Sequence, residues 1–103
     1  MRRVRLEAKA RAELHAAISW YEEQAPGLGA QLWESIDDVL RLLETTPDGS
    51  TTVPGVSPEL GVRRVFTRRF PYAIVFLVKG DLVEVIAVAH SSRRPNYWMD
   101  RIH

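Results

Sequence analysis

The sequence predicts an α+β fold in which an antiparallel helix pair packs on one face of a small, twisted, mainly antiparallel sheet, in the element order β-α-α-β-β-β. Three observations predict it. A short segment near the start alternates polar and apolar residues, residues 8–43 carry apolar side chains at helical spacing, and β-branched and aromatic residues dominate much of the chain beyond residue 61. At 103 residues, with 46% hydrophobic residues, the chain is expected to form a single domain over residues 1–103 with one modest core.

The first strand and the first helix are predicted by a change in the spacing of apolar residues near residue 8. Residues 3–7, RVRLE, place Val4 and Leu6 on one side, which predicts a short, half-buried strand. The apolar residues that follow recur at helical spacing, and Glu13 is assigned to the surface of this helix. The helix is expected to end before Pro26, because a proline disfavours helical backbone in the residue before it.

The second helix is predicted by an apolar stripe within residues 28–43. On its solvent side, Asp37 and Arg41 are four residues apart and are expected to form an ion pair. Because only a short turn separates the two helices, they should pack side by side as an antiparallel hairpin. Trp20 and Trp33 are expected to fill the interface between the helices or their contact with the sheet.

Residues 45–61 hold three of the six prolines and three of the six glycines, which predicts a long loop and points to a mobile or functional segment. Beyond it, three strands are predicted over 62–68, 72–78 and 82–90, joined as an antiparallel meander with a tight turn at Gly80-Asp81. The last two strands are nearly continuously apolar, so they should be central and covered by the helices. The first strand should pair at an edge, and the other face of the sheet, or the groove beside it, should be free.

Composition excludes several classes of site. The chain has no cysteine, which excludes disulfides and thiolate metal sites and fits a cytoplasmic protein. No apolar stretch has the length of a membrane span or of a signal-peptide core, so we expect a soluble protein with no membrane partner. The histidines and carboxylates show no metal-ligand spacing and no Gly-rich phosphate loop is present, so no metal or cofactor is expected.

Charge is distributed unevenly along the chain. Residues 1–60 carry six Lys/Arg and ten Asp/Glu, a net charge of −4, whereas residues 61–103 carry eight and three, a net charge of +5. This asymmetry points to a basic working face for a polyanion or for an acidic protein partner. The competing interpretation is ordinary solvated surface charge in each half.

The arginines of the second half are the candidate binding residues. In a meander the end of the last strand lies near the turn that precedes the middle strand, so His90 and Arg93 are expected close to Arg68 or Arg69. Guanidinium groups bind phosphate and carboxylate bidentately. The alternative is a set of surface arginines that protects an edge strand from aggregation. The candidate target- or phosphate-binding residues are Arg63, Arg64, Arg68, Arg69, Arg93 and Arg94.

Aromatic residues and one histidine accompany these arginines. Tyr72 and Trp98 are interpreted as core residues, although aromatic rings beside cations also stack on unpaired bases. Tyr97 follows a predicted surface turn, which leaves its role open. His90 has an unperturbed pKa near neutrality and is a candidate general acid or base, with a hydrogen-bonded structural role as the alternative.

Several segments together resemble the ParE/RelE superfamily of type II toxin–antitoxin toxins. They are A..EL..AI.WYEE..PGLG..L...I over 10–36, GVRRVFTRRFPYAIVF over 61–76 and VIAVAHSSRRPNYWMDR over 85–101. The resemblance covers nearly the whole chain in the right order. It implies a bacterial toxin that forms a hetero-oligomer with a cognate antitoxin, whose C-terminal segment wraps across the helix pair and the sheet.

The superfamily divides by target. RelE-like members are ribosome-dependent mRNA endonucleases, and in that reading the resemblance makes Arg68, His90 and Tyr97 the catalytic residues. ParE-like members instead inhibit DNA gyrase and lack the catalytic set. Ser91 occupies the basic position that RelE-like toxins place after the last strand, and the only lysines are Lys9 and Lys79. The WYE and RRFPY elements also favour the ParE-like branch, so a gyrase inhibitor is expected. An mRNA endonuclease is the alternative, and a decayed toxin that still binds its antitoxin is a third.

Overall fold

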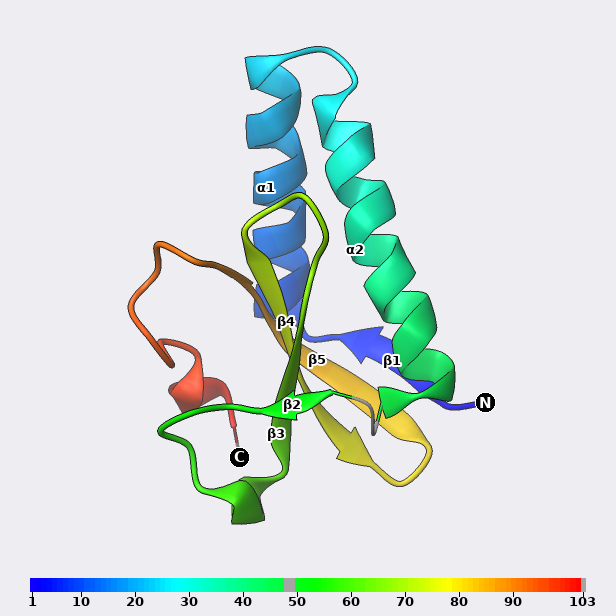
Figure 1. Ribbon diagram of the computed structural model, residues 1–103, viewed down its shortest axis with the longest axis vertical. Helices are drawn as coiled ribbons and strands as arrows, with labels where there is room; N and C mark the ends of the chain where they lie inside the picture. Colours follow the sequence, from blue (N-terminus) through cyan, green and yellow to red (C-terminus); the bar gives the residue numbers. More distant parts are fainter. Residues whose placement is uncertain (48–49, 103) are drawn as a thin grey trace.

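The computed structural model describes residues 1–47 and 50–102 and confirms the predicted α+β class. Strand β1 is followed by two helices and then by four further strands (Figure 1). Short 3-10 turns lie at Pro58–Leu60 and at Met99–Arg101. The elements are β1 (Arg3–Leu6), α1 (Ala8–Gln24), α2 (Leu28–Thr45), β2 (Thr51–Thr52), β3 (Val62–Phe66), β4 (Tyr72–Lys79) and β5 (Leu82–His90).

The sheet has five strands in the order β1-β5-β4-β3-β2. β3, β4 and β5 form the predicted antiparallel meander, with Tyr72 opposite His90 at one end. β1 pairs with β5 at an edge, as predicted, and the pairing is parallel, with Arg3 opposite Leu82 and Leu6 opposite Val85. The sheet is therefore mixed and mostly antiparallel.

The segment predicted as a continuous loop contains a fifth strand. Thr51 and Thr52 of β2 pair antiparallel with Arg64 and Arg63 of β3. The prediction missed β2 because two threonines between turn-forming residues carry no periodic signal of their own. Part of the segment predicted to be a loop, residues 48 and 49, lies outside the described residues.

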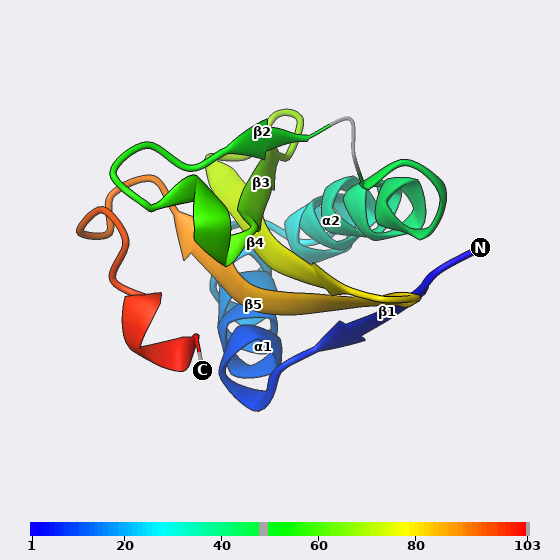
Figure 2. The same cartoon turned by 90° about the horizontal axis from the view of Figure 1, so that it is seen from below.

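The helix hairpin covers one face of the sheet, and its two helices approach closely near their shared turn (Figures 1 and 2). Gly29 makes this approach possible, because a Cβ there would lie 2.8 Å from the carbonyl oxygen of Ile18. The Glu22 carboxylate accepts hydrogen bonds from the backbone N–H groups of Gly27 and Gly29 at the start of α2. The predicted Asp37–Arg41 ion pair is present at 2.9 Å.

The two helix tryptophans do not fill the helix interface, which corrects the sequence interpretation. The side chains of Trp20 and Trp33 are 55% and 41% exposed. The interface is filled instead by smaller residues such as Ala17 and Leu32, together with the half-buried Tyr21, whose ring packs against Phe70. Trp20 and Trp33 are not among the residues that α1 and α2 bury.

A β-bulge in β5 decides which residues face which layer. Val75 pairs with Ala87 and Phe76 with Val85, so Ile86 has no partner opposite it. Val83 and Val85 before the bulge, and Val88 after it, therefore all join the core under the helices. Ile86 and Ala87 belong to a second apolar cluster.

This second cluster shows that the opposite face of the sheet, expected to be free itself or to have a free groove beside it, is free only in part. It joins Val75, Leu77 and Ile86 of the sheet to Val53 and Trp98. The chain after β5 passes across this face and ends in the turn at Met99–Arg101, on the side of the sheet away from α2 (Figure 2). The face is therefore partly covered by the protein's own C-terminal segment.

Among residues 1–47 and 50–102, no helix is both long enough and apolar enough to cross a bilayer.

Candidate functional site

A cleft with a volume of about 400 Å³ opens between β3, the neighbouring ends of β4 and β5, and the chain after β5. Ala73, Val75 and Ala89 contribute its apolar floor, and Trp98 lies against them. Asn96 links two of its walls, because its side-chain amide donates a hydrogen bond to the carbonyl of Pro54 at 3.4 Å. The cleft is thus built by segments far apart in the sequence.

Four of the predicted basic residues line this cleft, which we call the basic cleft: Arg64, His90, Arg93 and Arg94. The Arg93 guanidinium carbon lies 3.9 Å from the centre of the Tyr97 ring, and that of Arg64 lies 4.9 Å from the centre of the Phe66 ring. Both distances are within the range of cation–π attraction. The rings hold the two guanidinium groups without neutralising their charge.

Three of the predicted arginines lie elsewhere. Alternation along β3 sends Arg63 to the face opposite Arg64, where it donates to the carbonyl of Ser50 at 2.9 Å. In the turn between β3 and β4, Arg69 donates to the side chain of Gln31 on α2 at 2.8 Å, and the carbonyl of Arg68 accepts from Ser35. The turn therefore leans on α2, and the structure does not bring these arginines into the basic cleft.

His90 ends β5 with its ring held from two sides. Its Nδ1 accepts a hydrogen bond from the backbone N–H of Ser92 at 3.0 Å and lies 2.8 Å from the hydroxyl of the same residue. The ring also packs edge-on against Tyr72, with ring centres 5.1 Å apart. Because Nδ1 accepts, the ring proton of neutral His90 resides on Nε2.

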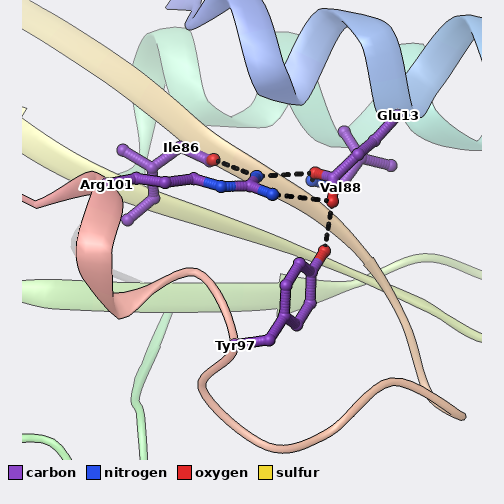
Figure 3. A network of polar contacts seen from close by, with 5 residues as sticks. All are labelled: Glu13, Ile86, Val88, Tyr97 and Arg101. Atoms are coloured by element: carbon purple, nitrogen blue, oxygen red, sulfur yellow. Dashed lines mark hydrogen bonds and ion pairs between the residues drawn. The ribbon is translucent and has the colours of Figure 1, made fainter.

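Behind the basic cleft, a half-buried carboxylate anchors the C-terminal segment to α1 (Figure 3). Oε1 of Glu13 accepts from Arg101 at 2.9 Å and from the backbone N–H of Val88 at 3.0 Å. Oε2 accepts from Arg101 at 3.2 Å and from the Tyr97 hydroxyl. We call Glu13, Tyr97 and Arg101 the Glu13 clamp.

The Glu13 clamp also completes the edge of the sheet. β1 pairs with β5 only as far as Val85, which leaves the next backbone groups of that edge without a strand partner. Glu13 accepts from the N–H of Val88, and Arg101 donates to the carbonyl of Ile86 at 3.0 Å (Figure 3). Side chains thus satisfy buried backbone groups where the neighbouring strand has ended.

Comparison with known protein families gives a match over residues 4–95 to the ParE toxin of type II toxin-antitoxin system, parDE. The chain belongs to the ParE toxin family. A solved chain described as the chromosomal ParDE TA system from P. aeruginosa has the same fold, with a TM-score of 0.73 and 23% sequence identity. The match covers 87% of this chain and 96% of that one. No curated protein matches.

Part of the site in this ParE-family toxin lies beyond the residues that match the family model. Tyr97, Trp98 and Arg101 follow residue 95, yet they line the basic cleft or hold its wall in place. The C-terminal end of this chain is therefore part of the site and not an appendage to the family fold.

The environment of the Glu13 clamp alters the acidity of its members. Burial, followed by the hydrogen bond to Glu13, raises the pKa of Tyr97 above its ordinary value. The bond to Glu13 likewise raises the pKa of Arg101, against the opposing effect of burial. Tyr97 therefore stays protonated, and Arg101 stays charged, throughout the neutral range.

Glu13 is the residue that sequence reasoning missed, because it was assigned to the outer surface of the first helix. A signal was present: Glu13 lies between Ala10 and Ala17 on the stripe that α1 buries, next to Leu14. A carboxylate on a buried stripe needs a partner. Its partners, Tyr97 and Arg101, are more than 80 residues away, so no local pattern could identify them.

Within the described ranges, no group of three or more histidine, aspartate or glutamate side chains is placed to hold a metal ion.

Proposed function

We propose that this toxin inhibits DNA gyrase by binding to it through the basic cleft, and that a cognate ParD antitoxin neutralises it in a hetero-oligomer. Family membership supports the toxin role. The gyrase target is favoured by the WYE and RRFPY elements of the sequence, which resemble the ParE-like branch.

One observation carries the proposed binding mode. Arg64, Arg93 and Arg94 face the basic cleft, and none of them forms an ion pair with a carboxylate among the described residues. By contrast, Arg41 and Arg101 each have a carboxylate partner at 2.9 Å. Guanidinium groups that keep their charge beside apolar surface suit an acidic partner.

The geometry of Tyr97 supports binding over cleavage of RNA. A tyrosine that moves protons in strand cleavage needs a hydroxyl that reaches the substrate. Here the hydroxyl donates to Glu13, and burial and Glu13 together raise the pKa of Tyr97. In addition, Arg68, which the RelE-like reading would use, does not line the cleft that holds His90.

The helix hairpin is the proposed antitoxin surface. Trp20, Trp33 and Leu42 expose large apolar side chains on α1 and α2. A partner segment that folds as it binds buries such side chains over a long path. Antitoxin on the helices and gyrase at the basic cleft would then use different sides of the protein.

A supercoiling assay with purified gyrase tests the proposal. We expect the toxin to inhibit supercoiling and its cognate antitoxin to restore it. Arg64→Ala and Arg93→Ala should each raise the inhibitory concentration about tenfold, the effect of losing about 1.4 kcal/mol of binding free energy. Arg3→Ala is the matched control, because Arg3 is an exposed arginine of β1, remote from the cleft and 3.9 Å from Asp81.

The ribosomal alternative is tested in parallel by primer extension on translated mRNA. Cuts at the ribosomal A site, with supercoiling unaffected at high toxin excess, would overturn the proposal. Equal loss of inhibition in Arg3→Ala and Arg93→Ala would remove the basic cleft from it.

A further inference from the structure

The basic cleft has the dimensions and lining of a small-molecule site, independently of any protein target. Its volume of about 400 Å³ lies within the roughly 300–1,000 Å³ typical of ligand pockets. Its floor is apolar, and its polar groups converge from β3, from the end of β5 and from the chain that follows. Such a combination favours a ligand with one apolar part and one charged part.

The charge at the cleft is positive and uncompensated. Arg64, Arg93, Arg94 and His90 line it, and within the described residues no aspartate or glutamate does. The Nε atom of Arg64 is buried and has no hydrogen-bond partner in the described part of the chain. One carboxylate would satisfy a single guanidinium, whereas three guanidiniums suit the multiple charges and oxygens of a phosphate group.

The rim of the cleft offers an aromatic surface beside the cations. The Phe66 ring is 60% exposed and lies next to Arg64, an unusual exposure for a phenylalanine in a strand. Tyr97 and Trp98 form the opposite wall, with Arg93 over the Tyr97 ring. A planar ring can stack on such surfaces while an attached phosphate contacts the guanidinium groups.

We infer that the basic cleft binds a nucleoside phosphate, with the phosphate at Arg64, Arg93 and Arg94 and the base against the exposed ring of Phe66. The inference goes beyond the proposed function and does not rest on it, because the ligand binds the free toxin with no gyrase present. The same chemistry occurs in a free nucleotide and in a nucleotide of a single strand. The free nucleotide is the ligand assigned here, since the cleft encloses a volume suited to one small molecule.

Calorimetric titration of the full-length toxin with ATP, with adenosine, and with pyrophosphate as a probe of the phosphate end tests the inference. We expect saturable ATP binding, with adenosine and pyrophosphate each binding at least about tenfold more weakly, because each makes only part of the contacts. Arg93→Ala should lower the affinity for ATP about tenfold. Arg3→Ala, outside the cleft, should leave ATP binding unchanged. Phe66→Ala should weaken the binding of ATP more than the binding of pyrophosphate, since the base loses its ring and the phosphate keeps Arg93 and Arg94. Because the Phe66 ring is exposed, the variant should fold normally.

Each other outcome overturns the inference. Absence of saturable ATP binding to the folded toxin would do so directly. Pyrophosphate binding as tight as that of ATP would reduce the cleft to a simple anion site. Binding of a single-stranded oligonucleotide without binding of ATP would show that the ligand is a strand. Inhibition of gyrase is a separate measurement, so its failure would leave the titration result standing.

Discussion

At the scale of single residues, Glu13 contributes more to this structure than its place in the sequence suggests. Its side chain is 16% exposed and that of Arg101 is 10% exposed, so their ion pair is largely shielded from water. Removing one member of such a pair leaves the other charged and uncompensated in a poorly hydrated place. The stability of the C-terminal segment should therefore depend on this carboxylate.

Glu13→Gln should lower the free energy of unfolding by about 2–3 kcal/mol, because Arg101 loses its counter-charge while the shape of the site is kept. Urea unfolding at neutral pH measures the change. Glu23→Gln is the matched control, since Glu23 is an exposed glutamate on the same helix. Equal midpoints for the two variants would contradict the role given to the Glu13 clamp.

Tyr97→Phe should change the alkaline stability of the protein. Because burial raises the pKa of Tyr97 in the folded state, the unfolded chain ionises first, near the ordinary value of 10.0. Tyr97 therefore contributes stability below that pH, and the contribution declines as the pH rises through it. The variant should be about 1 kcal/mol less stable at neutral pH, because the hydrogen bond to Glu13 is missing. As the pH rises above about 10, where the wild type begins to lose the contribution of Tyr97, the stability of the variant should decline less. Parallel curves of unfolding midpoint against pH would refute this assignment.

Glu84 should contribute stability that the protein loses at acid pH. Arg5 lowers its pKa most strongly, with burial opposing and Lys79 assisting, so Glu84 stabilises the fold above the ordinary carboxylate pKa and ceases to do so as the pH falls through its lowered value. Glu84→Gln should therefore flatten the decline of thermal stability with acidification. Asp38→Asn, an exposed carboxylate on α2, should leave that decline unchanged.

At the scale of elements, local pattern was sufficient for the helices and for the meander. Helical spacing and Pro26 predicted both helices, and β-branched runs predicted β3, β4 and β5. The sequence could not predict which face of the sheet each side chain of β5 occupies. The bulge at Ile86 reverses the alternation of β5, and it has no sequence signature here. The basic cleft was likewise predictable only in part, since a turn packed on α2 removes Arg69 from it.

Gly29→Ala tests the close approach of the two helices. Helix propensity alone predicts a gain of about 1 kcal/mol for this change. The added Cβ would lie 2.8 Å from a backbone oxygen of α1, so we expect a loss of about 1–3 kcal/mol instead. Thermal unfolding reports the sign. Ala30→Gly, at the exposed neighbouring position, measures the contribution of helix propensity by itself. A Gly29→Ala variant more stable than the wild type would refute the steric argument.

At the scale of the whole molecule, the sheet is packed on both sides. The helices cover one face, and the C-terminal segment with residues 53–56 covers part of the other, where Trp98 is 3% exposed (Figure 2). The basic cleft is the portion of this second face that the covering segment leaves open. The last residues of the chain therefore contribute both to folding stability and to the shape of the basic cleft.

Trp98→Ala should destabilise the protein by about 3 kcal/mol or more, because it leaves a cavity in the second apolar cluster. Trp20→Ala removes the same side chain from a position that is 55% exposed and should cost much less. Differential scanning calorimetry compares the two variants. Similar melting temperatures would mean that the C-terminal segment is not part of the cooperative fold.

The parallel pairing of β1 with β5 imposes an order in time on synthesis. Arg3 pairs with Leu82, which is synthesised 79 residues later. At typical elongation rates this delay is about 4–16 seconds, and β1 has no strand to pair with until then. The helix hairpin, whose contacts are local, has time to form during that interval. The wall of the cleft comes last, because it needs Arg101 to reach Glu13. A growing chain therefore exposes its helix hairpin before the wall of the basic cleft is complete. Under the function proposed above, the antitoxin would then have the first opportunity to bind.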